Sequence, residues 1–152
     1  MRTTKFDLMM NSIAVVVLAA ATLFLLLNWE NLPERIPSHY NFKGEPDAYG
    51  GTGSLIFLMV TGWIIVLMMC ILGKFPKYWN TGVERTPANE TVINRIVKDM
   101  MGVMIVSISL LFSYMLIVPV LQMNMGVWFM PLMLFVIFGT MIVTVVRLIR
   151  NR

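Results

Sequence analysis

Charged residues are scarce in this chain: Asp, Glu, Lys and Arg make up 13% of its 152 residues, whereas 58% are hydrophobic. A soluble domain of this size has too little interior to bury so much apolar surface. The single cysteine, Cys70, excludes a disulfide within the chain. The single histidine, His39, makes a poor basis for a structural zinc site, which needs four ligands. We therefore predict no metal site and no cofactor.

Four long stretches contain no Asp, Glu, Lys or Arg before their last turns, at residues 8–28, 54–73, 100–121 and 128–148. About 20 apolar residues, at about 1.5 Å of rise each, cross a hydrocarbon core roughly 30 Å thick. Apolar residues continue past the small run Ala19–Ala21, so we expect the first stretch to be retained as a span, not cleaved as a signal peptide. The sequence predicts one all-α membrane domain, 1–152, with four transmembrane helices in a four-helix bundle.

Basic residues lie almost entirely on one side of the predicted spans. Ten of the twelve occur before the first span, in the loop 74–99 and from the last turn of the fourth span to the C-terminus. The loop 29–53 holds the other two, Arg35 and Lys43. Lys and Arg are enriched in cytoplasmic loops, so this pattern predicts a cell-membrane protein with both termini in the cytoplasm. The net charge of +4 follows from this asymmetry and requires no nucleic-acid partner.

The predicted inner loop, 74–99, contains a helix start at Thr86–Pro87, with Thr86 as the N-cap and Pro87 at the first helical position. Apolar residues at helical spacing follow on one face, and Arg95, Lys98 and Asp99 lie off it. We therefore expect an amphipathic inner helix that runs into the third span. Pro119 is expected to kink that span near its outer end.

The outer loop, 29–53, is expected to be an ordered segment of 25 residues. Three prolines and a glycine are the predicted structural residues of its motif: Pro33, Pro37, Gly44 and Pro46. Proline disfavours a helix, so residues 36–42 are expected to be extended. A turn is expected at 41–44, where Gly44 supplies a positive φ, and a second bend at 45–47.

Hydrogen-bonding side chains concentrate in the same loop. The candidate ligand-binding residues are His39, Asn41, Glu45, Asp47 and Tyr49. Three roles are open for them: binding a ligand at the outer face, pairing with each other to stabilise the loop, or catalysis. Catalysis with Ser38 is disfavoured, because neighbouring residues of an extended strand point to opposite faces. A coupled transporter usually carries an ionisable group at mid-membrane, and the four spans have none there.

The segment LPERIPSHYNFKGEPDAYG, residues 32–50, resembles a bacterial and archaeal membrane family described as a domain of unknown function. That domain also forms the N-terminal part of Sdp-type immunity proteins. The shared pattern is Leu-Pro, Ile-Pro, then a His, an Asn, a Gly and Pro-Asp. FPKYWN at 75–80 and WFMPLMLFVIFGT at 128–140 also resemble stand-alone members. The resemblance implies a Gram-positive-type or archaeal cell membrane and no established activity.

These observations favour a non-enzymatic membrane protein whose outer loop binds a ligand at the membrane surface. The expected ligand is a membrane-active peptide or a lipid-linked molecule, and the expected role is immunity or envelope maintenance. The alternative is a membrane enzyme or small transporter that uses His39 and Asp47. The lipid bilayer is the expected partner, and assembly into a homo-oligomer is left open.

Overall fold

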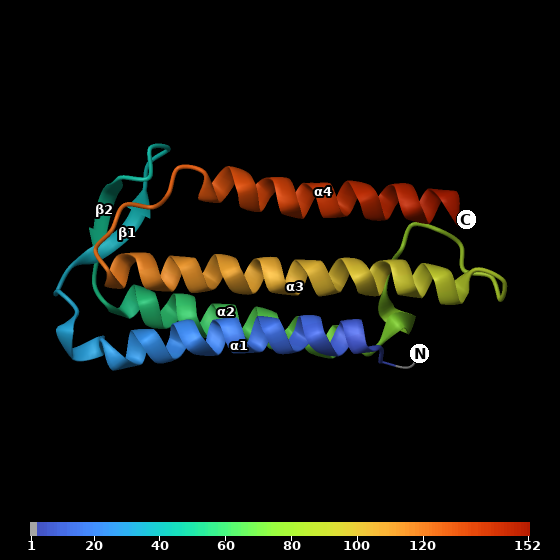
Figure 1. Ribbon diagram of the computed structural model, residues 1–152, viewed down its shortest axis with the longest axis horizontal. Helices are drawn as coiled ribbons and strands as arrows, with labels where there is room; N and C mark the ends of the chain where they lie inside the picture. Colours follow the sequence, from blue (N-terminus) through green and yellow to red (C-terminus); the bar gives the residue numbers. More distant parts are fainter. Residues whose placement is uncertain (1–2) are drawn as a thin grey trace.

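The computed structural model describes residues 3–152; Arg2, counted above with the basic N-terminus, lies outside the described residues. The fold is mostly helical (Figure 1). Its four long helices are α1 (Lys5–Leu27), α2 (Gly53–Leu72), α3 (Glu90–Val120) and α4 (Phe129–Arg150). Each is long and apolar enough to cross a membrane. The prediction of four long apolar helices is therefore confirmed, and they suggest a multi-pass membrane protein.

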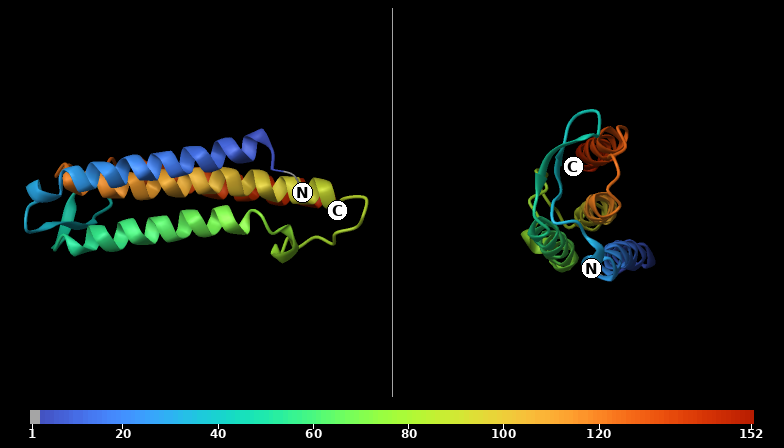
Figure 2. Two further views of the ribbon diagram at one scale, coloured as in Figure 1. Left: turned by 90° about the horizontal axis from the view of Figure 1, so that it is seen from below. Right: turned by 90° about the vertical axis from the view of Figure 1, so that its left-hand side faces the viewer.

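Helix α3 is the centre of the arrangement. It packs against α1, α2 and α4, whereas α4 has its main contact with α3 alone. Viewed from one end, α1, α2 and α3 form a triangle and α4 stands beside α3 on the far side (Figure 2). The four helices therefore do not share one core as in the predicted bundle.

Small and hydroxyl side chains join α1 to α3. The hydroxyl of Ser109 donates to the carbonyl oxygen of Ala14 at 2.5 Å, and that of Ser113 donates to Val17 at 3.3 Å. Ala14 and Ser109 are both fully buried. In a spanning segment, small residues let backbones approach, and hydroxyls link helices. These polar residues therefore hold the helices together.

The loop between α1 and α2 contains the two strands of the described residues. After a short 3₁₀ helix, η1 (Trp29–Asn31), the chain forms an antiparallel hairpin of β1 (Ile36–Tyr40) and β2 (Pro46–Gly50). The all-α prediction missed these strands, and the bend expected at 45–47 is replaced by the start of β2. Proline lacks an N–H but is tolerated as the first residue of an edge strand, so Pro46 does not prevent pairing. Ile36 is fully buried and anchors the hairpin in the core.

The turn of this hairpin contacts the connection between α3 and α4. Gly44 has a φ of 77°, and its N–H donates to Asn41. Its carbonyl oxygen accepts a 2.8 Å hydrogen bond from the N–H of Met125. A Cβ at position 44 would lie 1.8 Å from the Met125 oxygen. Glycine is therefore required both by the backbone conformation and by this close approach.

At the other end, the chain passes through a short 3₁₀ helix, η2 (Pro76–Tyr78), before α3 begins. The predicted helix start at Thr86 is wrong by three residues, since Asn89 is the N-cap of α3. The Asn89 side chain accepts from the N–H of Thr86, which closes a separate turn before the helix. Pro119 lies in the last turn of α3, so little helix remains beyond it for a kink to redirect.

Candidate functional site

The β1–β2 hairpin carries two irregularities in its pairing. Pro37 opposes Tyr49 and His39 opposes Ala48, which leaves Ser38 as an extra residue on β1. Tyr40 opposes Pro46, which leaves Asp47 as an extra residue on β2. A bulge re-aims side chains relative to a regular strand. The argument that Ser38 and His39 must face opposite ways therefore does not apply to this strand.

His39 and Asp47 form a direct pair at the bulged part of the hairpin. The Nδ1 atom of His39 lies 2.5 Å from Oδ1 of Asp47. The two side chains are 70% and 43% exposed. When the Nδ1–H group of a neutral ring donates a hydrogen bond to the carboxylate, the Nε2 atom carries the free lone pair. The pair thus orients the imidazole and leaves one nitrogen available to another group.

Asn41 and Glu45 organise the turn between the strands. The Asn41 side-chain oxygen accepts from the N–H groups of Lys43 and Glu45, at 2.8 and 3.1 Å. Its amide nitrogen donates to the Glu45 carboxylate at 3.1 Å. Asparagine commonly bonds to its own turn in this way. These contacts give both residues a structural role in the turn.

A cavity of about 450 Å³ lies beneath the hairpin, between β1 and helices α2, α3 and α4. Its polar residues are Ser38, His39, Tyr40 and Ser54. Its other walls are mostly apolar: Pro37, Leu55, Phe57, Leu58, Leu111, Met115, Pro119, Met125 and Met130. Of the five candidate residues, His39 alone lines this cavity, and Asn41, Glu45, Asp47 and Tyr49 do not. The cavity suits an amphiphilic group with its polar part against β1.

Tyr40 adds a feature that the sequence reasoning did not assign to a site. Its hydroxyl is buried and has no hydrogen-bond partner among the described residues. Burial raises the pKa of this phenol above its usual range, and the nearby Tyr114 and Tyr49 add to the shift. A buried polar group without a hydrogen-bond partner costs free energy, and this hydroxyl is too deeply buried to meet a group inside the cavity. In a regular strand, side chains alternate between the two faces, and this rule could have placed Tyr40 toward the helices. The bulge at Ser38 breaks the alternation, so the sequence does not reveal which way Tyr40 points.

The loop that forms this site is acidic. Residues 29–53 contain four carboxylates, at Glu30, Glu34, Glu45 and Asp47, and two basic residues, Arg35 and Lys43. The end of the molecule that carries the hairpin is therefore negative, in contrast to the opposite end with its excess of Lys and Arg. An excess of negative charge attracts cationic ligands to this end of the molecule.

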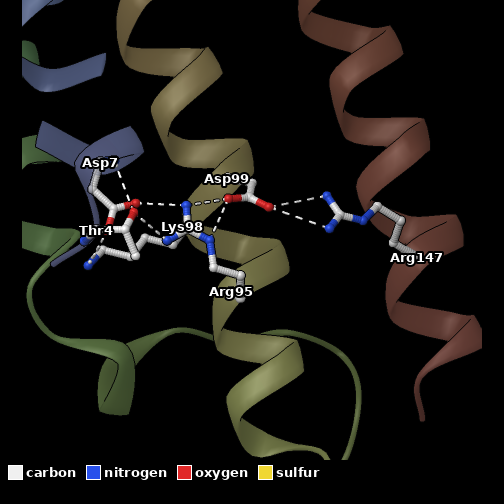
Figure 3. A network of polar contacts seen from close by, with 6 residues as sticks. All are labelled: Thr4, Asp7, Arg95, Lys98, Asp99 and Arg147. Carbon is white, nitrogen blue, oxygen red and sulfur yellow. Dashed lines mark hydrogen bonds and ion pairs between the residues drawn. The ribbon is translucent and has the colours of Figure 1, made fainter. Parts of the chain in front are cut away.

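A second polar cluster lies at that opposite end and joins α1, α3 and α4 (Figure 3). Arg95 lies 2.9 Å from Asp7 and 2.5 Å from Asp99, and Lys98 lies 3.1 Å from Asp7. The Arg95–Asp7 contact is an ion pair without hydrogen-bond alignment, because Asp7 Oδ1 has no hydrogen bond. Arg147 approaches Asp99 at 3.4 Å.

Sequence reasoning placed Arg95, Lys98 and Asp99 off the apolar face and did not single out Asp7. The capping box, in which Thr4 and Asp7 exchange hydrogen bonds, was the available signal for Asp7. Among residues 3–152, no group of three or more His, Cys, Asp and Glu side chains is placed to hold a metal ion.

Comparison with known proteins finds a match to a sequence family described as a domain of unknown function, DUF1648, over residues 16–62. This stretch includes the whole outer loop and the adjoining parts of α1 and α2. An "Uncharacterized protein" of Archaeoglobus fulgidus is 30% identical over 86 residues. That match covers 51% of this chain and 45% of the relative, so the chain matches less than half of the relative's length. No solved structure matches the chain.

Proposed function

We propose that this protein is a non-enzymatic membrane protein whose outer hairpin binds a cationic, membrane-active peptide and thereby protects the cell from it. The cavity beneath β1 carries this proposal. It has an apolar interior, a polar wall at Ser38, His39 and Tyr40, and an acidic surrounding loop. Membrane-active peptides are typically basic and amphipathic, with aromatic or aliphatic residues on one face. Their charge and apolar side chains match these features of the site.

Binding would use two parts of the hairpin. An apolar side chain of the peptide would enter the cavity between α2 and α3, where Leu58 and Met115 form part of the wall. Donor groups of the peptide would meet the free lone pair on Nε2 of His39, which lines the cavity. The acidic loop would raise the encounter rate, and this effect would weaken as salt is added. Peptide recognition would therefore combine shape, hydrogen bonding and charge.

This function requires the hairpin to face outward. The ten basic residues at the N-terminus, the loop 74–99 and the C-terminus favour a cytoplasmic location for both termini in the cell membrane. We expect a C-terminal phosphatase reporter, which folds only outside the cytoplasm, to be inactive, and a cytoplasm-active reporter to be active. The reverse result would place the hairpin on the wrong side for this function.

The binding test uses the protein in liposomes and a fluorescent cationic amphipathic peptide. Leu58→Trp should fill the cavity and weaken peptide binding about tenfold, because an apolar anchor residue contributes on the order of 1–2 kcal/mol to an interface. Leu67→Trp is the matched control, since Leu67 lies on the same helix, is 50% exposed and does not line the cavity. Cells producing Leu58→Trp should lose protection against the peptide. Equal binding by both variants would contradict the proposal, and stronger competition by a lipid-linked molecule would favour that ligand instead.

The His39–Asp47 pair supports a second candidate, a membrane hydrolase. An imidazole oriented by a carboxylate is the arrangement of a general base, and Ser38 lines the same cavity. No hydrogen bond joins Ser38 to His39 within the described residues, which favours binding over catalysis. Hydrolysis of a chromogenic ester that is lost in both Ser38→Ala and His39→Ala would favour the enzyme.

A further inference from the structure

The groove between α3 and α4 forms a second cavity, at the basic end of the molecule. It has a volume of about 420 Å³. Along α4 it extends from Phe135 to Arg147, about 18 Å at about 1.5 Å per residue. This length is close to one leaflet of the hydrocarbon core, roughly 15 Å. The groove therefore has the reach of a lipid chain that begins at the membrane surface.

The wall of the groove is effectively apolar. Val103, Phe135 and Val143 contribute hydrophobic side chains. Two threonines also line it, but Thr140 donates to the carbonyl of Val136 at 2.7 Å and Thr144 donates to that of Thr140 at 2.8 Å. Both hydroxyl protons are thus used within α4, so neither threonine has a donor left for a ligand. At Gly139 an added Cβ would meet nothing within 4 Å, so there is open space beside the helix.

Arg147 lies at the polar end of the groove with unused hydrogen-bonding capacity. Its side chain is 47% exposed, and its two terminal nitrogens reach Asp99 only at 3.4 Å. Asp99 is already bound more closely by Arg95, at 2.5 Å. A guanidinium has five N–H donors, so most of those on Arg147 have no acceptor among residues 3–152.

The cluster around Arg147 carries an excess of positive charge. It contains three basic side chains, Arg95, Lys98 and Arg147, and two carboxylates, Asp7 and Asp99 (Figure 3). Arg95 contacts both carboxylates and Lys98 contacts Asp7, so the excess positive charge is centred on Arg147. Basic pockets between transmembrane helices bind anionic lipid head groups.

We propose that this groove is a binding site for an anionic phospholipid. One acyl chain lies between α3 and α4, and the phosphate accepts hydrogen bonds from Arg147. The lipid would cover the face of α4 that no other helix covers, and its phosphate would supply the acceptor that Asp99 provides only in part. This site is independent of the outer hairpin and of the function proposed for it.

The test measures lipids retained by the purified protein, using native mass spectrometry with phosphatidylglycerol and phosphatidylcholine of identical chains. The wild-type protein should prefer the anionic lipid. Arg147→Gln should reduce this preference about fivefold, the effect expected for one basic residue at a membrane surface. Arg150→Gln is the matched control, because it removes a charge from the same helix end outside the groove. Inorganic phosphate should not compete, because it lacks the chain.

A second variant tests the place of the acyl chain and leaves the Arg147–Asp99 contact intact. Gly139→Leu should fill the groove and reduce retention of both lipids severalfold. Val145→Phe adds the same number of carbon atoms on a residue that is 52% exposed and outside the groove, and should retain lipid as the wild type does. Unchanged lipid preference in Arg147→Gln would overturn the proposal, and so would unchanged retention in Gly139→Leu.

Discussion

At each end of the molecule a carboxylate pairs with a nitrogen-bearing side chain, but the two pairs differ in how far they are exposed to water. At the outer hairpin, His39 and Asp47 lie 2.5 Å apart with 70% and 43% of their side chains exposed. At the other end, Asp7 is 4% exposed and is shared by Arg95 and Lys98. Exposed pairs contribute little stability, whereas removing one partner of a buried pair is costly. The buried pair therefore joins helices, and the exposed pair remains accessible to a ligand.

The hairpin is held to the helices by other means. Its turn is joined to the α3–α4 connection by the backbone hydrogen bond from Met125 to Gly44, and Ile36 is buried in the core. Neither contact uses a charged side chain. His39 and Asp47 are therefore not needed to hold the hairpin in position, whereas the cluster at the other end joins helices through its charged side chains.

The largest effect is expected at the contact between the hairpin turn and the helices. Gly44→Val places a Cβ on the Met125 oxygen and forces a β-branched residue to a φ of 77°, so it should lower the free energy of unfolding by about 3 kcal/mol. Gly82→Val is the control, because Gly82 has a φ of 65° with nothing within 4 Å of its added Cβ, and should cost about 1 kcal/mol. Thermal melting in detergent measures both. Equal losses would mean that the turn does not hold the hairpin in place.

The next effect concerns the buried carboxylate. Asp7→Asn keeps the shape of the side chain but leaves Arg95 and Lys98 without their shared charge. Because Arg95 is 26% exposed and Lys98 is 11% exposed, water relieves part of the cost, and we expect a loss of about 2 kcal/mol. Adding Lys98→Met to Asp7→Asn should recover part of the loss, since one unpaired cation is removed. If Asp7→Asn melted at the same temperature as the wild type, the buried cluster would contribute no more stability than the exposed pair at the other end.

The smallest effect is expected at the exposed pair. Asp47→Asn and His39→Ala should each change stability by less than about 1 kcal/mol, because exposed polar pairs contribute little stability. Both should nevertheless weaken peptide binding to liposomes that contain the protein, because the imidazole loses its orientation or is absent. A stable His39→Ala protein that still gives full protection in a survival assay would remove His39 from the functional account.

The candidate site could be predicted only in part. The loop residues and the positive φ of Gly44 follow from local preferences of proline, glycine and asparagine. The bulges at Ser38 and Asp47 arise from pairing between two strands, and they decide which side chains face the cavity. The sequence reasoning consequently chose five candidates, of which His39 alone lines the cavity, and left out Tyr40.

The sequence by itself determined the four apolar helices and the charge asymmetry between the two ends, because hydropathy and charge are properties of short continuous segments. Only the tertiary structure decided which polar groups are buried together. The hydrogen bond from Arg95 to Thr4 joins residues 91 positions apart, and the packing of α1 against α3 removes Asp7 from water. The two cavities also depend on packing, because each is lined by residues from elements that lie far apart in the sequence.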